Sequence, residues 1–104
     1  MTKIDYGYVA FEWDDSKNAI NQVKHGISFE TALTIFFDDN SLIQQDYIQD
    51  GEQRWKALGR VKNSMLILFV GHTYQDVDTG QEIIRIITAR QATPHEEKEY
   101  YGSY

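Results

Sequence analysis

Two arginines in the segment EIIRIITAR, residues 82–90, are the side chains of this sequence best suited to bind an anion. Arg85 lies inside an otherwise apolar run, and Arg90 closes that run. Removing an unpaired guanidinium from water costs several kcal/mol, so Arg85 must either face away from the core or have a partner. The paired donors of a guanidinium match the oxygens of a phosphate, so phosphate binding is the chemistry that these residues favour.

A second basic segment, RWKALGRVK at residues 54–62, contains four of the ten Lys and Arg residues of the chain. Side chains alternate along a strand, which puts Arg54, Lys56 and Arg60 on one face. If helices cover the other face of the sheet, these three side chains join Arg85 in a positive stripe on the uncovered face. The alternative interpretation is a solvated strand face near an acidic helix, and the residues alone leave both open.

His25 is a candidate of another kind, because imidazole titrates near neutral pH and can donate or accept a proton during catalysis. It follows Lys24 and precedes Gly26 at the expected end of a helix. Its alternative role, which the local sequence favours, is to bind the last carbonyl groups of that helix. The spacing of His25, His72 and His95 matches no zinc pattern, so neither a metal site nor a cofactor is predicted.

The composition is that of one globular domain. The 104 residues are 41% apolar and 25% charged, which predicts a single domain over 1–104 with residues 1–7 as a loose leader. The absence of cysteine excludes disulfides, thiolate metal sites and a cysteine nucleophile, and it suits the cytoplasm. No apolar run reaches the roughly 18 residues of a membrane span. The net charge of −6 argues against non-specific nucleic-acid binding by the whole surface.

The pattern of apolar residues predicts two helices near the N-terminus. A strand is expected at residues 8–13, followed by a helix at 16–25 that begins after Asp14 or Asp15 and ends at Gly26. Its apolar stripe, by which it is expected to pack, consists of Ala19, Ile20 and Val23. A second helix is expected at 29–38, beginning after Ser28.

Strands and one short helix make up the rest of the prediction. Strands are expected at 42–48, 54–61, 65–73 and 82–89, with a polar loop at 74–81. Thr93, Pro94 and Glu96 are typical of a helix start, so a helix is expected at 94–101. The fold class predicted is therefore α+β. A mostly antiparallel twisted sheet of about four to five strands carries two N-terminal helices and a short C-terminal helix, with the helices on one face.

The segment FEWDDSKNAINQVKHGISFETA, residues 11–32, resembles the opening of the BrnT family, the toxin half of BrnT/BrnA toxin–antitoxin systems. A later Gly-Arg step and an Arg-Ile-Ile-Ser-Ala-Arg segment of that family are similar to residues 59–60 and 85–90, with Thr88 in place of Ser. Two long motifs in the right order make the resemblance specific over about residues 9–101. The other matching residues are Phe11, Glu12, Trp13, Asp14, Lys17, Asn21, Lys24, His25, Gly26, Ser28, Phe29, Glu30, Ala32, Ala92, Thr93, Glu96 and Tyr100.

The resemblance implies a RelE-like fold and a metal-independent endoribonuclease that inhibits bacterial growth until a cognate antitoxin neutralises it. It also implies a hetero-oligomer with a BrnA-like antitoxin of the ribbon-helix-helix type, which supplies the contacts to operator DNA and with which the toxin represses its own operon. The alternative is a catalytically silent module that binds the antitoxin and acts only in operon regulation. The candidate catalytic residues carried over are Lys24, His25, Arg60, Arg85 and Arg90.

Contacts to RNA are expected from Arg54 and Lys56 of the basic segment and from Tyr100, whose phenol can stack on a base or bond a phosphate. Core packing is the alternative role of Tyr100. Two segments are more acidic than the family pattern, the loop YQDVDTGQE and the tail HEEKEYY. Charge complementarity predicts that an antitoxin segment carrying carboxylates lies over the arginine stripe in the neutralised complex.

Overall fold

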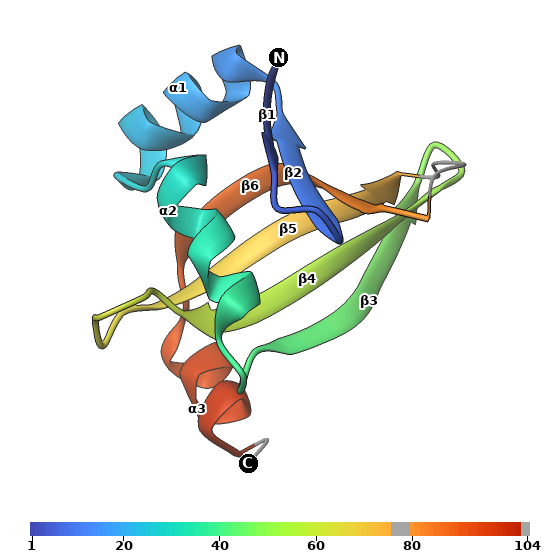
Figure 1. Ribbon diagram of the computed structural model, residues 1–104. Coiled ribbons are helices and arrows are strands. Elements are labelled where there is room, and N and C mark those ends of the chain that lie inside the picture. The colour runs from blue at the N-terminus through green and yellow to red at the C-terminus, as the bar shows by residue number, and fades with distance from the viewer. Residues whose placement is uncertain (76–79, 103–104) are drawn as a thin grey trace.

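The computed structural model describes residues 1–75 and 80–102. In this part of the chain the structure is α+β, as the sequence predicts, with one sheet and helices at both ends (Figure 1). The expected polar loop at 74–81 lies partly outside the described residues. The strands are β1 (Thr2–Asp5), β2 (Val9–Trp13), β3 (Leu42–Gln49), β4 (Glu52–Arg60), β5 (Ile67–Gln75) and β6 (Glu82–Gln91). The helices are α1 (Asp15–His25), α2 (Phe29–Leu33), the 3-10 helix η1 (Thr34–Phe37) and α3 (Pro94–Gly102).

The sheet has six strands in the order β1-β2-β6-β5-β4-β3. It is mixed, because β2 and β6 run parallel while the other neighbouring pairs are antiparallel. The predicted number of about four to five strands is therefore corrected to six, and the mostly antiparallel sheet includes one parallel pair. The strand outside the five expected ranges is β1, where a loose leader was expected. Its backbone pairs with β2, for example at Ile4 and Phe11, and it forms one edge of the sheet.

Local capping starts and ends α1 as the sequence predicts. The carboxylate of Asp14 accepts hydrogen bonds from the backbone N–H groups of Ser16 and Lys17, at 2.8 and 3.1 Å. Gly26 ends the helix in the left-handed conformation, with φ of 71°, and donates its N–H to the carbonyl of Gln22. These bonds satisfy backbone groups that a helix leaves open at its ends, so α1 is held at both termini.

The second helix begins after Ser28, whose hydroxyl accepts from the N–H of Thr31. It is an α-helix only to Leu33 and tightens into η1, where a single helix over 29–38 was expected. The tightening accompanies a very close approach to β4. A Cβ on Gly59 would lie 2.7 Å from Cβ of Ile35 and 3.0 Å from its carbonyl oxygen. Only glycine leaves room for η1 to press this closely on the strand.

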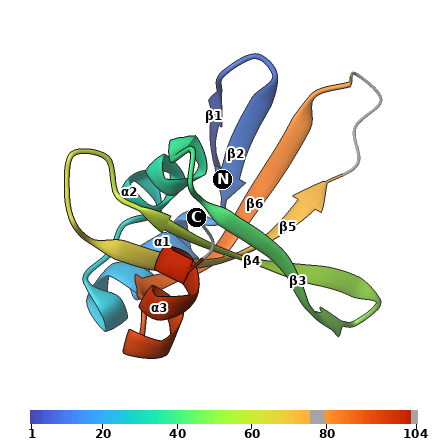
Figure 2. The same ribbon diagram turned by 90° about the horizontal axis from the view of Figure 1, so that it is seen from below.

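The helices are not confined to one face of the sheet. The larger core packs α2 and η1 on one face, and it includes Phe29 and Ile35 together with Val70 of β5. A smaller core lies on the opposite face, where Tyr100 of α3 packs with Leu58 and Ile67. Figures 1 and 2 show α3 beside the sheet where β6 ends, and Figure 1 shows it well separated from α1. The expectation of a single helix-covered face is therefore wrong, and α3 covers one end of the other face.

Helix α1 packs by its polar side, contrary to the predicted apolar stripe. Ile20 and Val23 are 64% and 91% exposed, whereas Asn18 and Asn21 are 8% and 5% exposed. The reason lies in β6, because β2 pairs only with its first residues and leaves the main chain around Ala89 open. The amide of Asn21 fills this gap, donating to the carbonyl of Ala89 at 2.8 Å and accepting from its N–H at 3.1 Å. None of the described helices is long and apolar enough to cross a membrane.

Candidate active site

Basic residues from two strands, β4 and β6, share the sheet face that carries α3. Ile84 and Ile86 belong to the larger core under α2, so Arg85 between them faces the other way. Lys56 pairs with Gly71, and Leu58 pairs with Phe69, which in turn pairs with Arg90. Alternation along β4 places Arg54, Lys56 and Arg60 on this face. On β6 a register shift, in which Gly71 pairs with Thr88 and His72 with Ile86, leaves one extra residue between Arg85 and Arg90, so both arginines lie on this same face. We call it the cationic face. Its members are Arg54, Lys56, Arg60, Arg85 and Arg90.

Arg85 is bound to a carboxylate that the sequence did not reveal as its partner. Its Nη2 lies 3.0 Å from Oε2 of Glu12, its neighbour on the parallel strand β2. The side chain of Glu12 is only 11% exposed, while that of Arg85 is 38% exposed. Nε of Arg85 is buried without a hydrogen-bond partner. The guanidinium is therefore anchored at one end, and its exposed part still faces solvent.

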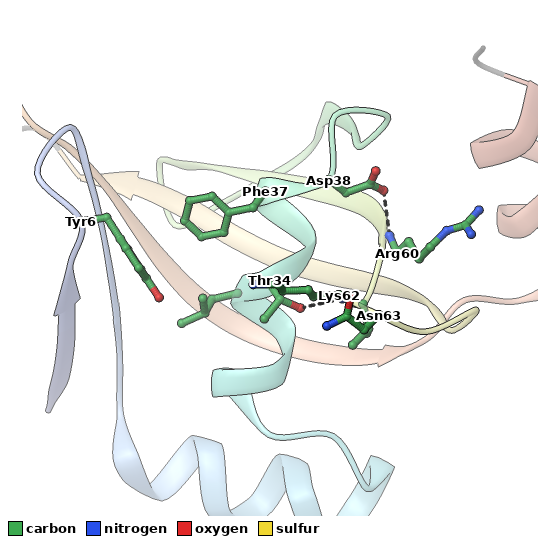
Figure 3. A pocket seen from close by; sticks show the side chains of 9 residues that line it. Tyr6, Thr34, Phe37, Asp38, Arg60, Lys62 and Asn63 are labelled. Carbon is green, nitrogen blue, oxygen red and sulfur yellow. Dashed lines mark hydrogen bonds between the residues drawn. The ribbon is translucent and has the colours of Figure 1, made fainter.

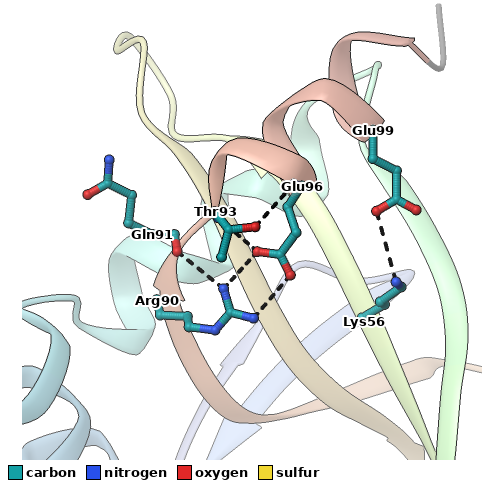
Figure 4. A network of polar contacts seen from close by, with 6 residues as sticks. All are labelled: Lys56, Arg90, Gln91, Thr93, Glu96 and Glu99. Carbon is teal, nitrogen blue, oxygen red and sulfur yellow. Dashed lines mark hydrogen bonds and ion pairs between the residues drawn. The ribbon is translucent and has the colours of Figure 1, made fainter.

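Arg90 takes part in the start of α3 (Figure 4). Its Nη1 and Nη2 donate to the two oxygens of Glu96 at 2.7 and 3.0 Å, and its guanidinium lies 4.1 Å from the ring centre of Phe69. Glu96 also accepts from the N–H of Thr93, which completes the predicted capping box. The hydrogen bond from Arg90 outweighs burial and lowers the pKa of Glu96, and the same bond raises the pKa of Arg90.

Lys56 and Arg54 also have acidic neighbours. Nζ of Lys56 lies 4.0 Å from Glu99 of α3, and Nη2 of Arg54 lies 3.5 Å from Glu52 on the same strand. A shallow hollow of about 50 Å³ is lined in part by Arg54, Phe69 and Gly71 of this face. Four basic residues of the cationic face are thus close to a glutamate, so an RNA phosphate would have to compete with carboxylates at each of them.

Arg60 occupies the other end of α3. Its guanidinium lies 5.9 Å from the ring centre of Tyr101, and its Nη1 is 3.5 Å from Sδ of Met65. The backbone N–H of Arg60 donates to Asp38 at 2.9 Å. Helix α3 therefore begins beside Arg90, passes Lys56 and ends beside Arg60. Arg54 and Arg85 pair instead with glutamates of the sheet, Glu52 and Glu12.

Tyr100 is a core residue, which corrects the expected role in RNA binding. Its side chain is 1% exposed, and its hydroxyl donates to Asp38 at 2.6 Å. Burial acts to raise the pKa of Asp38, but the bonds from Tyr100 and from the N–H groups of Arg60 and Asn40 outweigh it and lower that pKa. Tyr100 thus anchors α3 to the segment after η1. A base could not stack on a ring that is covered by the smaller core.

Lys24 and His25 lie at the end of α1, beside β6. His25 follows Asn21 by one helical turn, so its side chain lies on the side of α1 that faces the open edge of β6 near Ala89. His25 is half-buried and Lys24 is exposed. This placement puts both residues near the part of β6 that ends with Arg90. Arg85, earlier on the strand, lies with Glu12 where β2 still pairs with β6.

A pocket much larger than the hollow beside Arg54 lies elsewhere. It has a volume of about 590 Å³ and is lined by Tyr6, Phe37, Lys62 and neighbouring residues of η1 and the β4–β5 turn. Figure 3 shows that the guanidinium of Arg60 points away from this pocket. The other candidate catalytic residues do not line it. Among residues 1–75 and 80–102, no group of three or more His, Asp or Glu side chains is placed to hold a metal ion.

Sequence reasoning missed the acidic half of this site. Glu12 stands between the buried residues Phe11 and Trp13, and a charge at that position signals a buried partner in the same way as Arg85 does. Two opposite charges, Glu12 and Arg85, each stand among buried neighbours, and this was the available sign that they pair. No local sequence pattern, however, shows that two strands so far apart in the chain are adjacent. Glu96 was recognised as a cap but not as the partner of Arg90.

Comparison with known protein families identifies the family of this chain. A comparison with curated proteins returns no match. Residues 13–96 match the family described as "Ribonuclease toxin, BrnT, of type II toxin-antitoxin system". The matched range includes α1, the cationic face and the first turn of α3. Since it covers most of the 104 residues, the chain belongs to the BrnT family of ribonuclease toxins of type II toxin–antitoxin systems.

Proposed function

We propose that this toxin cleaves the RNA backbone without a metal ion, at the junction of the cationic face and the end of α1. The observation that carries the proposal is the strand register, which collects five basic residues on one sheet face. The bond from Asn21 to Ala89 holds α1 beside β6. Ribonuclease toxins act on a polyanion, and fixed guanidinium groups are suited to its phosphates.

The reaction needs three catalytic contributions from the protein. The 2′-hydroxyl must lose a proton as its oxygen attacks phosphorus, the charge on the pentavalent phosphorus must be stabilised, and the departing 5′-oxygen must gain a proton. Arg85 and Arg90 are proposed to hold the non-bridging oxygens, with Arg60 as a further cation. His25 is proposed to transfer a proton, with Lys24 as the alternative residue for this role.

The ion pairs of Arg85 and Arg90 limit how many of their guanidinium nitrogens can bind a phosphate. Arg85 uses one nitrogen for Glu12 and keeps part of its guanidinium exposed, so it can bind a phosphate while it remains anchored. Arg90 has two nitrogens committed to Glu96. Arg85 is therefore the arginine better placed to bind substrate in this conformation. Arg54 and Lys56 are proposed to hold the flanking RNA, whereas Tyr100 is no longer a candidate.

Type II membership implies an antitoxin partner. We propose that this partner is BrnA-like with a ribbon-helix-helix fold, and that the resulting hetero-oligomer binds the operator through the antitoxin and represses the operon. The toxin's net charge of −6 supports assigning the DNA contacts to the antitoxin rather than to this chain. We propose that the protein acts in the cytoplasm, where its proposed RNA substrate and operator DNA are found.

A second function remains open, a silent module that only binds the antitoxin. It is favoured by the carboxylates beside the cationic face, because Glu12 and Glu96 already occupy donors of Arg85 and Arg90. The two functions differ in their effect on growth. A toxin with ribonuclease activity arrests growth when produced alone, while a silent module does not.

The test is cleavage of a mixed-sequence RNA by the purified chain, in EDTA. We expect cleavage by the wild type and a loss on the order of 100-fold in Arg85→Gln, the cost of removing one oxyanion donor. Lys98→Gln, a change of an exposed cation on α3, is the matched control and should cleave at the wild-type rate. The double variant with Glu12→Gln and Arg85→Gln leaves no unpaired carboxylate, so its activity separates catalysis from folding.

Three outcomes would overturn parts of the proposal. Equal rates for the wild type and Arg85→Gln remove Arg85 from the mechanism. Cleavage that stops in EDTA and returns with Mg²⁺ overturns metal independence. A wild-type chain that neither cleaves RNA nor slows growth, yet forms a stable complex with the product of the adjacent gene, establishes the silent module instead.

A further inference from the structure

The outer side of α1 presents an apolar surface that the fold leaves unused. Ile20 and Val23 are 64% and 91% exposed, and Ala19 beside them is exposed as well. These three residues form the only apolar stripe that the helix sequence offers at helical spacing. In a helix that packs on a core, such a stripe would face inward. Here it faces solvent, and we call it the α1 stripe.

The fold holds the helix in this orientation with specific hydrogen bonds. Asn21 replaces a strand partner at Ala89, as described above, and also donates to the carbonyl of Ile27 at 2.8 Å. Asn18 accepts from the N–H of Phe29 at 2.9 Å and donates to Glu30 at 3.0 Å, which ties α1 to the start of α2. The helix cannot turn its stripe inward without leaving these buried groups unpaired.

Rigidity makes the α1 stripe well suited to bind a partner. The helix is capped at both ends and fixed by its asparagines, so a partner would order few further groups on binding. Exposed leucine-sized side chains are common when scattered, but neighbouring ones on a fixed helix form a contiguous surface. Burying Ile20 and Val23 together would remove apolar area from water at no cost in helix folding.

The charges beside the stripe indicate the chemistry of the partner. Lys17 and Lys24 are seven residues apart, so they lie two turns from each other on one flank of the stripe, with Ile20 between them. Both are exposed, and neither has an ion pair among the described residues. On the cationic face, by contrast, Arg85, Arg90, Lys56 and Arg54 lie beside glutamates of this chain.

We propose that the α1 stripe is the docking surface for the antitoxin. The occupant is a segment of the antitoxin with apolar side chains over Ile20 and Val23 and carboxylates directed at Lys17 and Lys24. This inference rests on the proposed antitoxin partnership and names the surface that serves it. It replaces the expectation that the antitoxin lies over the arginines, because those cations already have acidic neighbours.

Docking at this surface also explains how the partner neutralises the enzyme. Lys24 borders the stripe, and His25 follows it on the side of α1 that faces β6. A segment bound along the α1 stripe therefore covers Lys24, the alternative proton-transfer residue, without displacing any ion pair of the cationic face. Inhibition would act through access to the end of α1 and not through competition for Arg85 or Arg90.

The test uses the full chain co-produced with the protein encoded by the adjacent gene. The variant is the double substitution Ile20→Gln with Val23→Gln, because glutamine is a good helix former and the side chains are exposed. The matched control is Ile48→Gln with Met65→Gln, which changes two apolar residues of comparable exposure, 69% and 75%, on β3 and in the β4–β5 turn. Binding is measured by titration, and RNA cleavage is measured on each free chain.

We expect the α1 variant to bind the antitoxin at least 100-fold more weakly while cleaving RNA at the wild-type rate, so that the antitoxin no longer neutralises it. The control should bind like the wild type. The charge component has its own variant, Lys17→Glu, which should weaken binding mainly at low salt, with Lys98→Glu as its control.

The outcomes separate this inference from the function on which it rests. Wild-type affinity in the α1 variant overturns the docking surface while leaving the toxin–antitoxin function intact. A free wild-type chain that forms a dimer through the α1 stripe, broken by the same variant, overturns it in favour of a second copy. A wild-type chain that cleaves RNA but binds no adjacent-gene product overturns the docking surface, and one that does neither overturns the proposed function as well.

Discussion

The guanidinium of Arg85 and the carboxylate of Glu12 lie 3.0 Å apart across the parallel pair of β2 and β6, although 73 residues separate them in the chain. The pair is unequally buried, since the side chain of Glu12 is 11% exposed and that of Arg85 is 38% exposed. Leaving a buried carboxylate without its partner costs more folding free energy than leaving a cation unpaired where water can reach it. The two residues therefore differ in what their removal does.

Arg85→Ala is predicted to destabilise the protein by about 2 kcal/mol, because it leaves the carboxylate of Glu12 unpaired. Glu12→Gln should cost less than about 1 kcal/mol, since the exposed guanidinium can be hydrated and the amide still accepts a bond. Urea unfolding of the two variants at pH 7 measures the difference. Equal destabilisation would mean that the unequal burial has no energetic consequence.

The pH dependence of stability should report on His72. Its side chain is fully buried between Phe36 and Tyr74, and this burial lowers its pKa to about 4, although a bond to the carbonyl of Val70 opposes the shift. The folded state therefore favours the neutral ring. Its stabilising contribution is present above the unfolded pKa of 6.5 and is lost as the pH falls from there toward 4.

The predicted loss from His72 between pH 7 and pH 5 is about 2 kcal/mol. Glu96 and Asp38, whose pKa values are also lowered, lose their contributions only below the ordinary values of 4.5 and 3.8, so they do not interfere in this range. Urea unfolding at the two pH values measures the effect. His72→Gln should abolish most of the difference, and an unchanged difference in that variant would assign it to another group.

Tyr100→Phe tests the anchor of α3. The change keeps the ring in the smaller core and removes the hydrogen bond of 2.6 Å to Asp38. We expect a loss of about 1 kcal/mol in the free energy of unfolding, together with a higher pKa of Asp38 because a bond that lowers it is gone. Tyr8→Phe, at a side chain that is 94% exposed, is the control and should leave the stability unchanged.

Gly59→Ala tests the close approach of η1 to β4. The added methyl group would meet the side chain and the carbonyl oxygen of Ile35 at 2.7 and 3.0 Å, so η1 must move away from the strand. Overpacking of this kind costs about 1–3 kcal/mol. Gly102→Ala has nothing within 4 Å of the new atom and serves as the control. A melting temperature that falls no further in Gly59→Ala than in the control would contradict the predicted steric conflict.

Asn21→Leu is predicted to destabilise the protein although it makes α1 look more amphipathic. The amide bonds both backbone groups of Ala89 and the carbonyl of Ile27, and leucine would leave all three unpaired. We expect a loss of about 2–3 kcal/mol, measured by thermal or urea unfolding. Gln22→Leu, next to it on the exposed side, should change the stability by less than about 0.5 kcal/mol.

The sequence by itself determined the local elements of this protein. Helix starts at Asp14, Ser28 and Thr93 and the end of α1 at Gly26 follow from hydrogen bonds between residues a few positions apart, and all were predicted. Strand alternation likewise predicted that Arg54, Lys56 and Arg60 share one face of β4. Each of these inferences needs only the short-range geometry of the backbone.

The tertiary structure alone decided which surfaces those elements bury and which charges they pair. No local sequence pattern shows that β6 extends beyond its parallel partner β2 and leaves an open edge. That open edge is the reason why α1 turns Asn21 inward and Ile20 outward. In the same way the ion pair between Glu12 and Arg85 and the hydrogen bond from Tyr100 to Asp38 form only when the chain folds. The physical reason is that a buried polar group must be satisfied by whatever the fold brings next to it, and that neighbour comes from a distant part of the chain.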